Sequence, residues 1–308
     1  MTRRRRERTR GDLYEEVTAR IIAQMEEGTV PWVQPWTAEE AGGPVLGLPQ
    51  NAATRRAYSG INILLLWGAA QEQGRESQLW LTFKQALALG GAVRKGEKGT
   101  TIVYADRFTP ESERQKAEES GEAAREVAFL KRYTVFHVNQ CDGLPDDAVT
   151  SRASLSPRQI EPEAERLIQA TGADVRVGGD RAYYVPSQDF IQVPPQAAFR
   201  DQINYYRTCF HELGHWTGHA TRLARDLATR FGTKDYAREE LVAEMASAFL
   251  CAEMGIVPTV RHADYLANWL AVLREDKRAI FRAASLASKA ADFVLSFRTQ
   301  QETDQRAA

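Results

Sequence analysis

The stretch His211-Glu212-Leu213-Gly214-His215 decides the fold of the second half of this chain. On an α-helix, residues four apart lie on one face, so the imidazoles of His211 and His215 could bind one metal ion. Glu212 points to the side of that pair, where its carboxylate could accept a proton from a water molecule that attacks a carbonyl. Apolar residues flank the stretch, and burying three polar groups without a partner is costly. The stretch therefore predicts a zinc hydrolase site with His211 and His215 as ligands and Glu212 as the base.

The third metal ligand is a choice between two segments. His219 follows His211 by eight residues, which on a continuous helix is an axial rise of about 12 Å, too far for both to bind one ion. A helix break at Gly218 could bring His219 closer, as in the metzincin pattern H-E-x-x-H-x-x-G-x-x-H. However, Thr221 stands where that pattern has its third histidine. We therefore expect His219 beside the ligands and not among them.

The other segment is a helix expected over residues 237–254, which contains Glu239, Glu240 and Glu244. Glu240 and Glu244 are four apart and share a face with small residues, so another helix can approach them closely. We expect Glu240 to complete the ligand set, as in gluzincins, and Glu244 to accept the second N–H of a ligand histidine. Glu239 is expected to be exposed. Zn²⁺ suits this ligand set, and Mn²⁺ or another divalent ion is compatible with it.

The donor that would stabilise the oxyanion formed during hydrolysis stays open. The sequence offers several candidates and does not choose among Tyr183, Tyr184, Tyr205, Tyr206 and His219. For each tyrosine, the alternative is ordinary packing in the core.

The composition indicates a globular protein that does not enter a membrane. Of 308 residues, 43% are hydrophobic and 26% are charged, as in soluble globular domains. No apolar run reaches the length of a membrane-spanning helix. The basic start at residues 2–10 has no apolar segment after it, so it is not typical of a secretory signal. Because the three cysteines are odd in number and far apart, a disulfide framework is not expected and a cytoplasmic location is.

The order of predicted elements indicates an α+β protein of two domains. We expect a basic tail over residues 1–10, a first domain over 11–140, a linker over 141–156 and a second domain over 157–300. Periodicity predicts helices over residues 12–27, 62–73, 83–90, 158–170, 201–218, 237–254 and 263–297. Strands are expected over residues 78–82, 101–107, 133–138, 175–177, 182–185 and 190–193. The polar stretch 111–126 is expected to be a solvated insertion.

A nucleic-acid contact would need a local patch, because the net charge of the chain is −1 and neither half is basic. Lys84, Arg94, Lys95 and Lys98 form a basic cluster beside a glycine-rich turn, where they could contact phosphates. Several aromatic residues could stack on bases without sequence preference, namely Trp32, Trp36, Tyr58, Trp80 and Phe83. The alternative for each aromatic residue is a place in the core.

Both halves of the chain resemble ArdC-type antirestriction proteins. In the first half the resemblance rests on segments such as Tyr58-Ser59-Gly60-Ile61-Asn62 and Trp80-Leu81-Thr82-Phe83-Lys84. In the second half it runs from Ala182-Tyr183-Tyr184-Val185-Pro186 through the histidine motif to Glu239-Glu240-Leu241-Val242-Ala243-Glu244. The resemblance implies a first domain that binds single-stranded DNA and a second domain with a zincin-like (gluzincin-type) metallopeptidase fold. It supports His211, His215 and Glu240 as metal ligands and Glu212 as the base.

This resemblance leads to a functional hypothesis. The chain would shield the DNA of a bacterial mobile element, such as a conjugative plasmid, from restriction during transfer. Its partners would be single-stranded DNA, bound without sequence preference, and an unidentified protein or peptide substrate. Two alternatives stay open. The chain could be a peptidase that its DNA domain only localises, or a DNA-binding protein whose metal site is catalytically idle.

Overall fold

The structure is a computed structural model, and it describes residues 12–32, 47–75, 77–109, 112–113, 123, 127–150, 157–227, 233–257 and 266–307. By their contacts the residues divide into two compact units. The first unit comprises Met1–Gln50, Arg56–Gln78 and Ser151–Ala308, and the second comprises Asn51–Arg55 and Leu79–Thr150. Helices and sheets are both present, which confirms the predicted α+β class.

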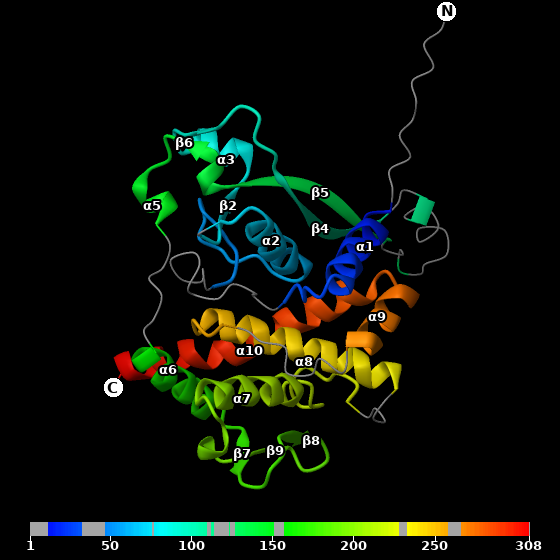
Figure 1. Cartoon of the computed structure of the whole chain (residues 1–308), viewed down its shortest axis with the longest axis vertical. Coiled ribbons are helices and arrows are strands. Elements are labelled where there is room, and N and C mark those ends of the chain that lie inside the picture. Colours follow the sequence, from blue (N-terminus) through cyan, green and yellow to red (C-terminus); the bar gives the residue numbers. More distant parts are fainter. Residues whose placement is uncertain are drawn as a thin grey trace, which may run out of the picture. The chain divides into compact units, whose positions relative to one another are not determined.

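The first unit contains seven of the described α-helices and one small sheet (Figure 1). The helices are α1 (Leu13–Glu26), α2 (Ile61–Glu72), α6 (Pro157–Ala170), α7 (Ile203–Trp216), α8 (Lys234–Glu253), α9 (Leu266–Glu275) and α10 (Ala279–Ala307). The strands are β7 (Asp174–Val177), β8 (Tyr183–Val185) and β9 (Phe190–Val193). Helix α7 carries the histidine motif and packs against α6, α8 and the sheet.

Helices α7 and α8 approach each other closely at Gly214. A Cβ atom added to Gly214 would lie 3.1 Å from the Cα of Ala243 and 3.2 Å from its carbonyl oxygen. Small residues on facing helices therefore bring the two backbones together, as the face of small residues on 237–254 predicts. Helix α8 is buried along most of its length, since α10 also packs against it.

The small sheet has the order β7-β9-β8, in which β9 pairs with β7 in parallel and with β8 antiparallel. Ile191 and Val193 of β9 are buried and anchor the sheet against α7. Strand β8 lies at the sheet edge and brings Tyr183 and Tyr184 toward the histidine motif. The combination of an active-site helix and a small sheet agrees with the fold predicted for this part of the chain.

The N-terminal helices belong to the same unit. Asp12 caps α1 by accepting a hydrogen bond from the backbone N–H of Tyr14, as predicted. The segment after α1 packs Trp32 edge-on against Trp269 of α9, with ring centroids 5.5 Å apart. Before α2, the Gly60 backbone N–H donates to the Ser288 hydroxyl of α10 at 2.8 Å. The contacts of Trp32 and Gly60 join segments that lie on either side of residues 141–156 in the sequence. The domain boundaries expected from the sequence stay a prediction.

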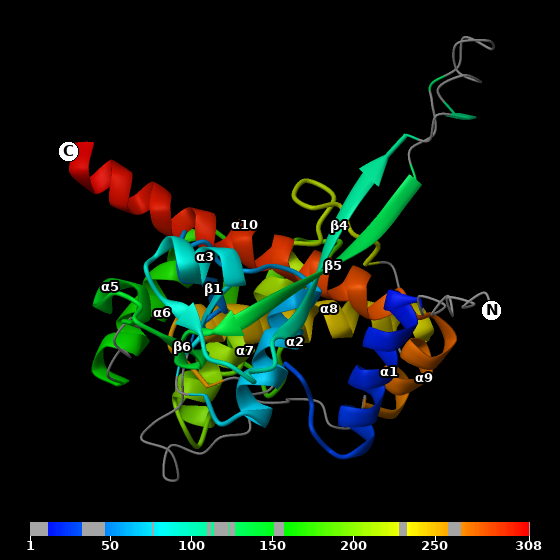
Figure 2. The same cartoon turned by 90° about the horizontal axis from the view of Figure 1, so that it is seen from above.

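The second unit is built around a four-stranded sheet of order β1-β2-β5-β4. Its strands are β1 (Gln50–Asn51, at the unit boundary), β2 (Leu79–Leu81), β4 (Thr100–Phe108) and β5 (Val127–His137). Strands β4 and β5 pair antiparallel from Thr100↔Val135 to Phe108↔Val127 and form a long ribbon (Figure 2). Around the sheet lie α3 (Phe83–Ala88), α5 (Asp146–Val149) and the short pair β3 (Ala92–Val93) and β6 (Cys141–Asp142).

Two predicted elements differ from the observed ones by more than a few residues. Strand β5 begins at Val127, six residues before the predicted start at residue 133, because it pairs along the whole of β4. The prediction of a single terminal helix over residues 263–297 is wrong. Two helices, α9 and α10, are separated at Asp276, whose side chain accepts a hydrogen bond from the Arg278 backbone N–H. The tail 1–10, residues 151–156 of the linker and most of the polar stretch 111–126 lie outside the described residues.

A membrane-spanning helix is not found within the described part of the chain, where no helix has both the length and the apolar character that one requires.

Candidate metal centre

Helix α7 places the two motif histidines side by side. Their Nε2 atoms are 3.2 Å apart, and their rings stand nearly perpendicular at 82°. His211 is buried, whereas His215 is partly exposed toward a pocket. The two rings lie side by side because residues four apart are on the same face of an α-helix.

Helix α8 adds the carboxylate of Glu240 to this pair. Its Oε2 lies 3.5 Å from His211 Nε2, and its Oε1 lies 3.4 Å from His215 Nε2. One ligand atom from each of the three residues falls within 4.8 Å of the other two. Two imidazole nitrogens and one carboxylate oxygen are the protein ligands of a catalytic zinc site with an open position. The residues present therefore fit a divalent metal ion.

The other nitrogen of each histidine faces a second carboxylate. Glu244 Oε1 lies 3.9 Å from His211 Nδ1, close to this nitrogen but beyond hydrogen-bonding distance, so its predicted role as acceptor stays a prediction. Glu239 Oε1 lies 3.2 Å from His215 Nδ1. The prediction that Glu239 is exposed is wrong, because its exposed fraction is only 8%. His215 is one turn further along α7 than His211 and so lies over Glu239, which the sequence pattern of α8 alone does not reveal.

Arg225 holds Glu239 in place from the loop after α7. Its Nε donates to Glu239 Oε2 at 3.0 Å, and its Nη2 donates to Glu239 Oε1 at 2.8 Å. The same guanidinium donates to the Thr217 hydroxyl at 2.8 Å and to the Gly214 carbonyl at 2.6 Å. A planar fork of this kind fixes a carboxylate in one orientation. The structure therefore contains a buried series of contacts from Arg225 through Glu239 to His215 that no sequence pattern predicted.

The ionisation of these groups follows from their mutual contacts. Burial raises the pKa of Glu240, but hydrogen bonds to His211 and His215 outweigh this and hold the pKa below its usual range. Burial likewise raises the pKa of Glu239, while His215 and Arg225 lower it further than burial raises it. For His215, burial lowers the pKa, and hydrogen bonds to Glu239 and Glu240 raise it well above its usual value. Both carboxylates are therefore held as anions beside the histidines.

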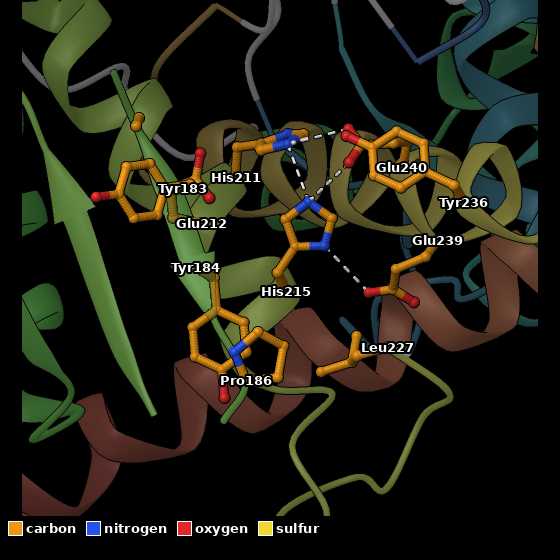
Figure 3. Close-up of a pocket in the computed structure, with 11 residues that line it drawn as sticks. Tyr183, Tyr184, Pro186, His211, Glu212, His215, Leu227, Tyr236, Glu239 and Glu240 are labelled. Atoms are coloured by element: carbon orange, nitrogen blue, oxygen red, sulfur yellow. Dashed lines mark hydrogen bonds and ion pairs between the residues drawn. The ribbon is translucent and has the colours of Figure 1, made fainter. Parts of the chain in front are cut away.

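A pocket opens onto the three candidate ligands. Figure 3 shows Glu212 and Tyr183 on one side of the histidines and Glu240, Glu239 and Tyr236 on the other. The exposed fraction of Glu212 is 5%. The remaining lining residues come mainly from the edge strand and the loop after α7, namely Ala182, Tyr184, Pro186 and Leu227. A substrate group in this pocket would meet the metal ligands and Glu212 together.

The pocket narrows the open choice of oxyanion donor. Tyr184 lines it, but its hydroxyl donates to Asp189 at 2.7 Å and accepts from Arg222 at 3.2 Å. Tyr205 and Tyr206 are buried and do not line the pocket, and neither does His219, whose Nδ1 bonds to the Thr221 hydroxyl. Two lining tyrosines fit the role better: Tyr183 and Tyr236, the latter not considered from the sequence.

The candidate DNA-contacting residues divide by burial. Trp32 and Trp80 have exposed fractions of 1% and 0%, so the prediction that they stack on bases is contradicted, because a buried ring offers no face. Tyr58 is half-buried and Phe83 is exposed. Lys84, Lys95 and Lys98 are exposed, while exposed Arg94 pairs with Glu97 and Asp142. Trp36 lies outside the described residues.

Comparison with protein-family models defines the class of protein. Residues 162–286 match the zincin-like metallopeptidase model, and residues 11–136 match the N-terminal domain of the anti-restriction factor ArdC. A zincin-like fold implies a bound divalent metal ion. Together with the full-length similarities below, these matches show that the chain belongs to the ArdC-type antirestriction family.

Individual relatives match over nearly the whole chain. The protein y4eC of Sinorhizobium fredii is 41% identical over 99% of this chain and 98% of its own length. Two DNA primases TraC of Escherichia coli are 40% and 42% identical over 94% and 95% of this chain, which spans only 20% and 28% of their lengths. Crystal structures of the antirestriction protein ArdC of plasmid R388 are 41% identical. The metal-free form has a TM-score of 0.77 over 94% of this chain, and the Mn(II)-bound form 0.74 over 93%, each with 98% of that chain covered.

Proposed function

We propose that this protein shields the DNA of a bacterial mobile element from restriction by binding single-stranded DNA, and that it carries a metal-dependent peptidase site. The observation that carries the second part is the meeting of His211, His215 and Glu240 in one pocket with Glu212. The first part is supported by family membership and by exposed lysines in the second unit.

In this proposal His211, His215 and Glu240 hold the ion through the atoms that already face one another. Zn²⁺ suits two imidazoles and a carboxylate, and Mn²⁺ is bound in the related R388 protein. The ion when bound supplies Lewis-acid chemistry by polarising a carbonyl and lowering the pKa of water. Glu239 would accept a hydrogen bond from Nδ1 of His215, which leaves the Nε2 lone pair of that histidine toward the ligand centre, while Glu244 faces Nδ1 of His211 at 3.9 Å.

Glu212 is the proposed base. It follows His211 directly on α7 and lines the same pocket, on the side of Tyr183. Its carboxylate would take a proton from the attacking water molecule and pass that proton to the leaving amine nitrogen of a peptide bond. The substrate would be a protein or peptide, as the zincin-like metallopeptidase match suggests.

The DNA-binding part concerns the second unit. Lys84, Lys95 and Lys98 are exposed, and cationic side chains attract a phosphate backbone without regard to sequence. Two relatives are DNA primases, which contain a segment similar to this chain as one part of a longer protein. Single-stranded DNA is the form of DNA that enters during conjugative transfer, so binding it fits a protective role.

Metal analysis of purified protein tests the proposed site. We expect Glu240→Ala to weaken metal binding by more than the roughly 10- to 100-fold loss of affinity that is typical of residues that only contact a ligand. The metal content of the purified variant should therefore fall. Glu253→Ala, at the other end of α8, is the matched control and should retain the metal. Full metal occupancy in Glu240→Ala would refute the third-ligand assignment.

A Glu212→Gln variant separates the two parts of the function. We expect it to retain the metal and to lose peptidase activity, because the amide cannot accept the proton. Protection of incoming DNA from restriction in a plasmid transfer assay is then measured in the same variant. If protection survives, the protein protects DNA by binding it and the site is not needed for that task. If protection is lost while DNA binding persists, the hydrolase site takes part in it.

A further inference from the structure

We infer that single-stranded DNA binds on the β4–β5 ribbon at a surface formed by Tyr104, Tyr133 and Lys131, which we call the tyrosine surface. This inference rests on the proposed DNA binding and names where in the second unit it occurs. The aromatic residues expected from the sequence to stack on bases lie elsewhere, and among them Trp32 and Trp80 are buried.

The pairing register puts these three residues on one face of the ribbon. Tyr104 is opposite Lys131, and Tyr133 is opposite Ile102. Side chains alternate between the faces of a strand, so positions 102 and 104 and their partners share a face. The two tyrosines are therefore diagonal neighbours, and their ring centroids lie 6.1 Å apart with the planes at 88°.

The exposure of this face is unusual for aromatic side chains. Tyr104 is 50% exposed and Tyr133 is 46% exposed. At the base of the ribbon the same face is covered, since the exposed fraction of Val135 is 0%. Large apolar groups left in water at neighbouring positions indicate a surface that a partner covers. A tyrosine ring suits a partner with a flat apolar face and a polar edge.

The charged residues of the ribbon indicate which class of partner the tyrosine surface binds. Among the ribbon residues whose side chains the structure describes, the charged ones are Lys131 and Arg132, both basic. Lys131 shares the face of the tyrosines, whereas Arg132 is opposite Val103 and points to the other face. Stacking rings beside a cation are the means by which proteins bind single strands without sequence preference. Paired bases in duplex DNA do not offer their faces to such rings.

The test uses the full chain, a fluorescently labelled oligo(dT) strand and anisotropy titrations at several salt concentrations. We expect Tyr104→Ala and Tyr133→Ala each to weaken binding by about 5- to 100-fold. Tyr104→Phe and Tyr133→Phe, which keep the ring, should bind like the unchanged protein. If an alanine variant unfolds, Tyr104→Leu provides the same comparison, because it keeps apolar bulk and removes the aromatic face.

Variants of Lys131 and Arg132 test which face of the ribbon binds DNA. Lys131→Ala should lower the slope of log affinity against log salt by about 0.7, the value of one lost contact with a single strand. Arg132→Ala is the matched control, with the same change of charge on the opposite face, and should leave the slope unchanged. Equal effects of the two variants would overturn the assignment of the face.

The outcomes distinguish this inference from the proposed function. If the unchanged protein binds oligo(dT) and the tyrosine-to-alanine variants bind equally well, the tyrosine surface is wrong and DNA binding stands. If the unchanged protein does not bind oligo(dT), DNA binding and the tyrosine surface both fail. Equally tight binding of a duplex, with the same losses in the tyrosine variants, would overturn the stacking role.

Discussion

The candidate metal centre of the first unit and the proposed tyrosine surface of the second unit differ in how their groups are held. In the metal centre, buried side chains from α7, α8 and one loop fix one another, as Arg225 fixes Glu239 and Glu239 faces His215. On the tyrosine surface, the half-exposed rings of Tyr104 and Tyr133 from two paired strands contact each other edge-on. The first arrangement requires precise distances between ligand atoms, whereas the second requires only open aromatic faces and a nearby cation.

This difference suggests how each region tolerates change. A buried site of linked charges should lose function when any supporting group is altered, because an unpaired buried charge is costly. An exposed surface should lose binding affinity while the stability of the fold changes little. Substitutions that keep the fold but move one property at a time can therefore break or sharpen the comparison.

The largest effect is expected where an aromatic residue of the second unit is buried. Trp80 of β2 is fully buried and packs edge-on against His137, with ring centroids 5.0 Å apart. Trp80→Ala should lower the free energy of unfolding by about 3–5 kcal/mol. Tyr104→Ala, on the exposed face, should lower it by about 1 kcal/mol or less. Denaturant titrations followed by far-UV circular dichroism measure both, and equal losses would contradict the division into core and surface aromatics.

The geometry of the candidate metal centre was largely predictable from the sequence, because the spacing of His211 and His215 on one helix brings their rings together. Glu240 was also predictable, since its face of small residues allows α7 to approach. Glu239 was not, because its burial depends on how far α7 is shifted along α8. Arg225 was missed for a related reason, since a loop residue has no periodicity that reveals its target.

The second unit was less predictable in its site than in its strands. The β-branched and aromatic runs predicted β2, β4 and the end of β5, but aromatic content alone does not tell which rings are buried. Trp80 and Tyr104 are both strand aromatics in the sequence, and only the pairing register and the covering of each face separate them. The tyrosine surface therefore emerges from the structure.

The second-largest effect is expected from Glu239, whose carboxylate contacts the Nδ1 atom of His215. Glu239→Gln should weaken metal binding by about 10- to 100-fold, because an amide neither compensates the charge nor fixes the histidine as a carboxylate does. Competition with a metal chelator at fixed pH measures this affinity. Glu253→Gln on the same helix is the control. An unchanged affinity in Glu239→Gln would mean that the contact of 3.2 Å between Glu239 and His215 has no positioning role.

A smaller effect is expected from the close approach of α7 and α8. Alanine normally stabilises a helix relative to glycine by up to about 1 kcal/mol. At Gly214 the added methyl group would lie 3.1 Å from the Ala243 backbone, and overpacking of this kind costs about 1–3 kcal/mol. Gly214→Ala should therefore lower the melting temperature. Gly68→Ala in α2, where the methyl group would meet only the flexible Gln24 side chain at 3.3 Å, is the matched control. Stabilisation by Gly214→Ala would show that the helices can separate freely.

The smallest effect concerns the turn beside the pocket, where Arg222 pairs with Asp189 and Tyr184 donates to the same carboxylate. The hydrogen bond from Arg222 lowers the pKa of Asp189 below its usual 3.8, although burial opposes this. A lowered folded-state pKa means that the pair stabilises the protein above about pH 3.8 and loses this effect as the pH falls through the folded value. Because Asp189 is 38% exposed, solvent screening limits the contribution to about 0.2–1 kcal/mol. Asp189→Asn should therefore be less stable than the unchanged protein at pH 7, and the difference should shrink below about pH 3.8. Urea titrations across this pH range measure it, and a difference that grows on acidification would contradict the sign of the linkage.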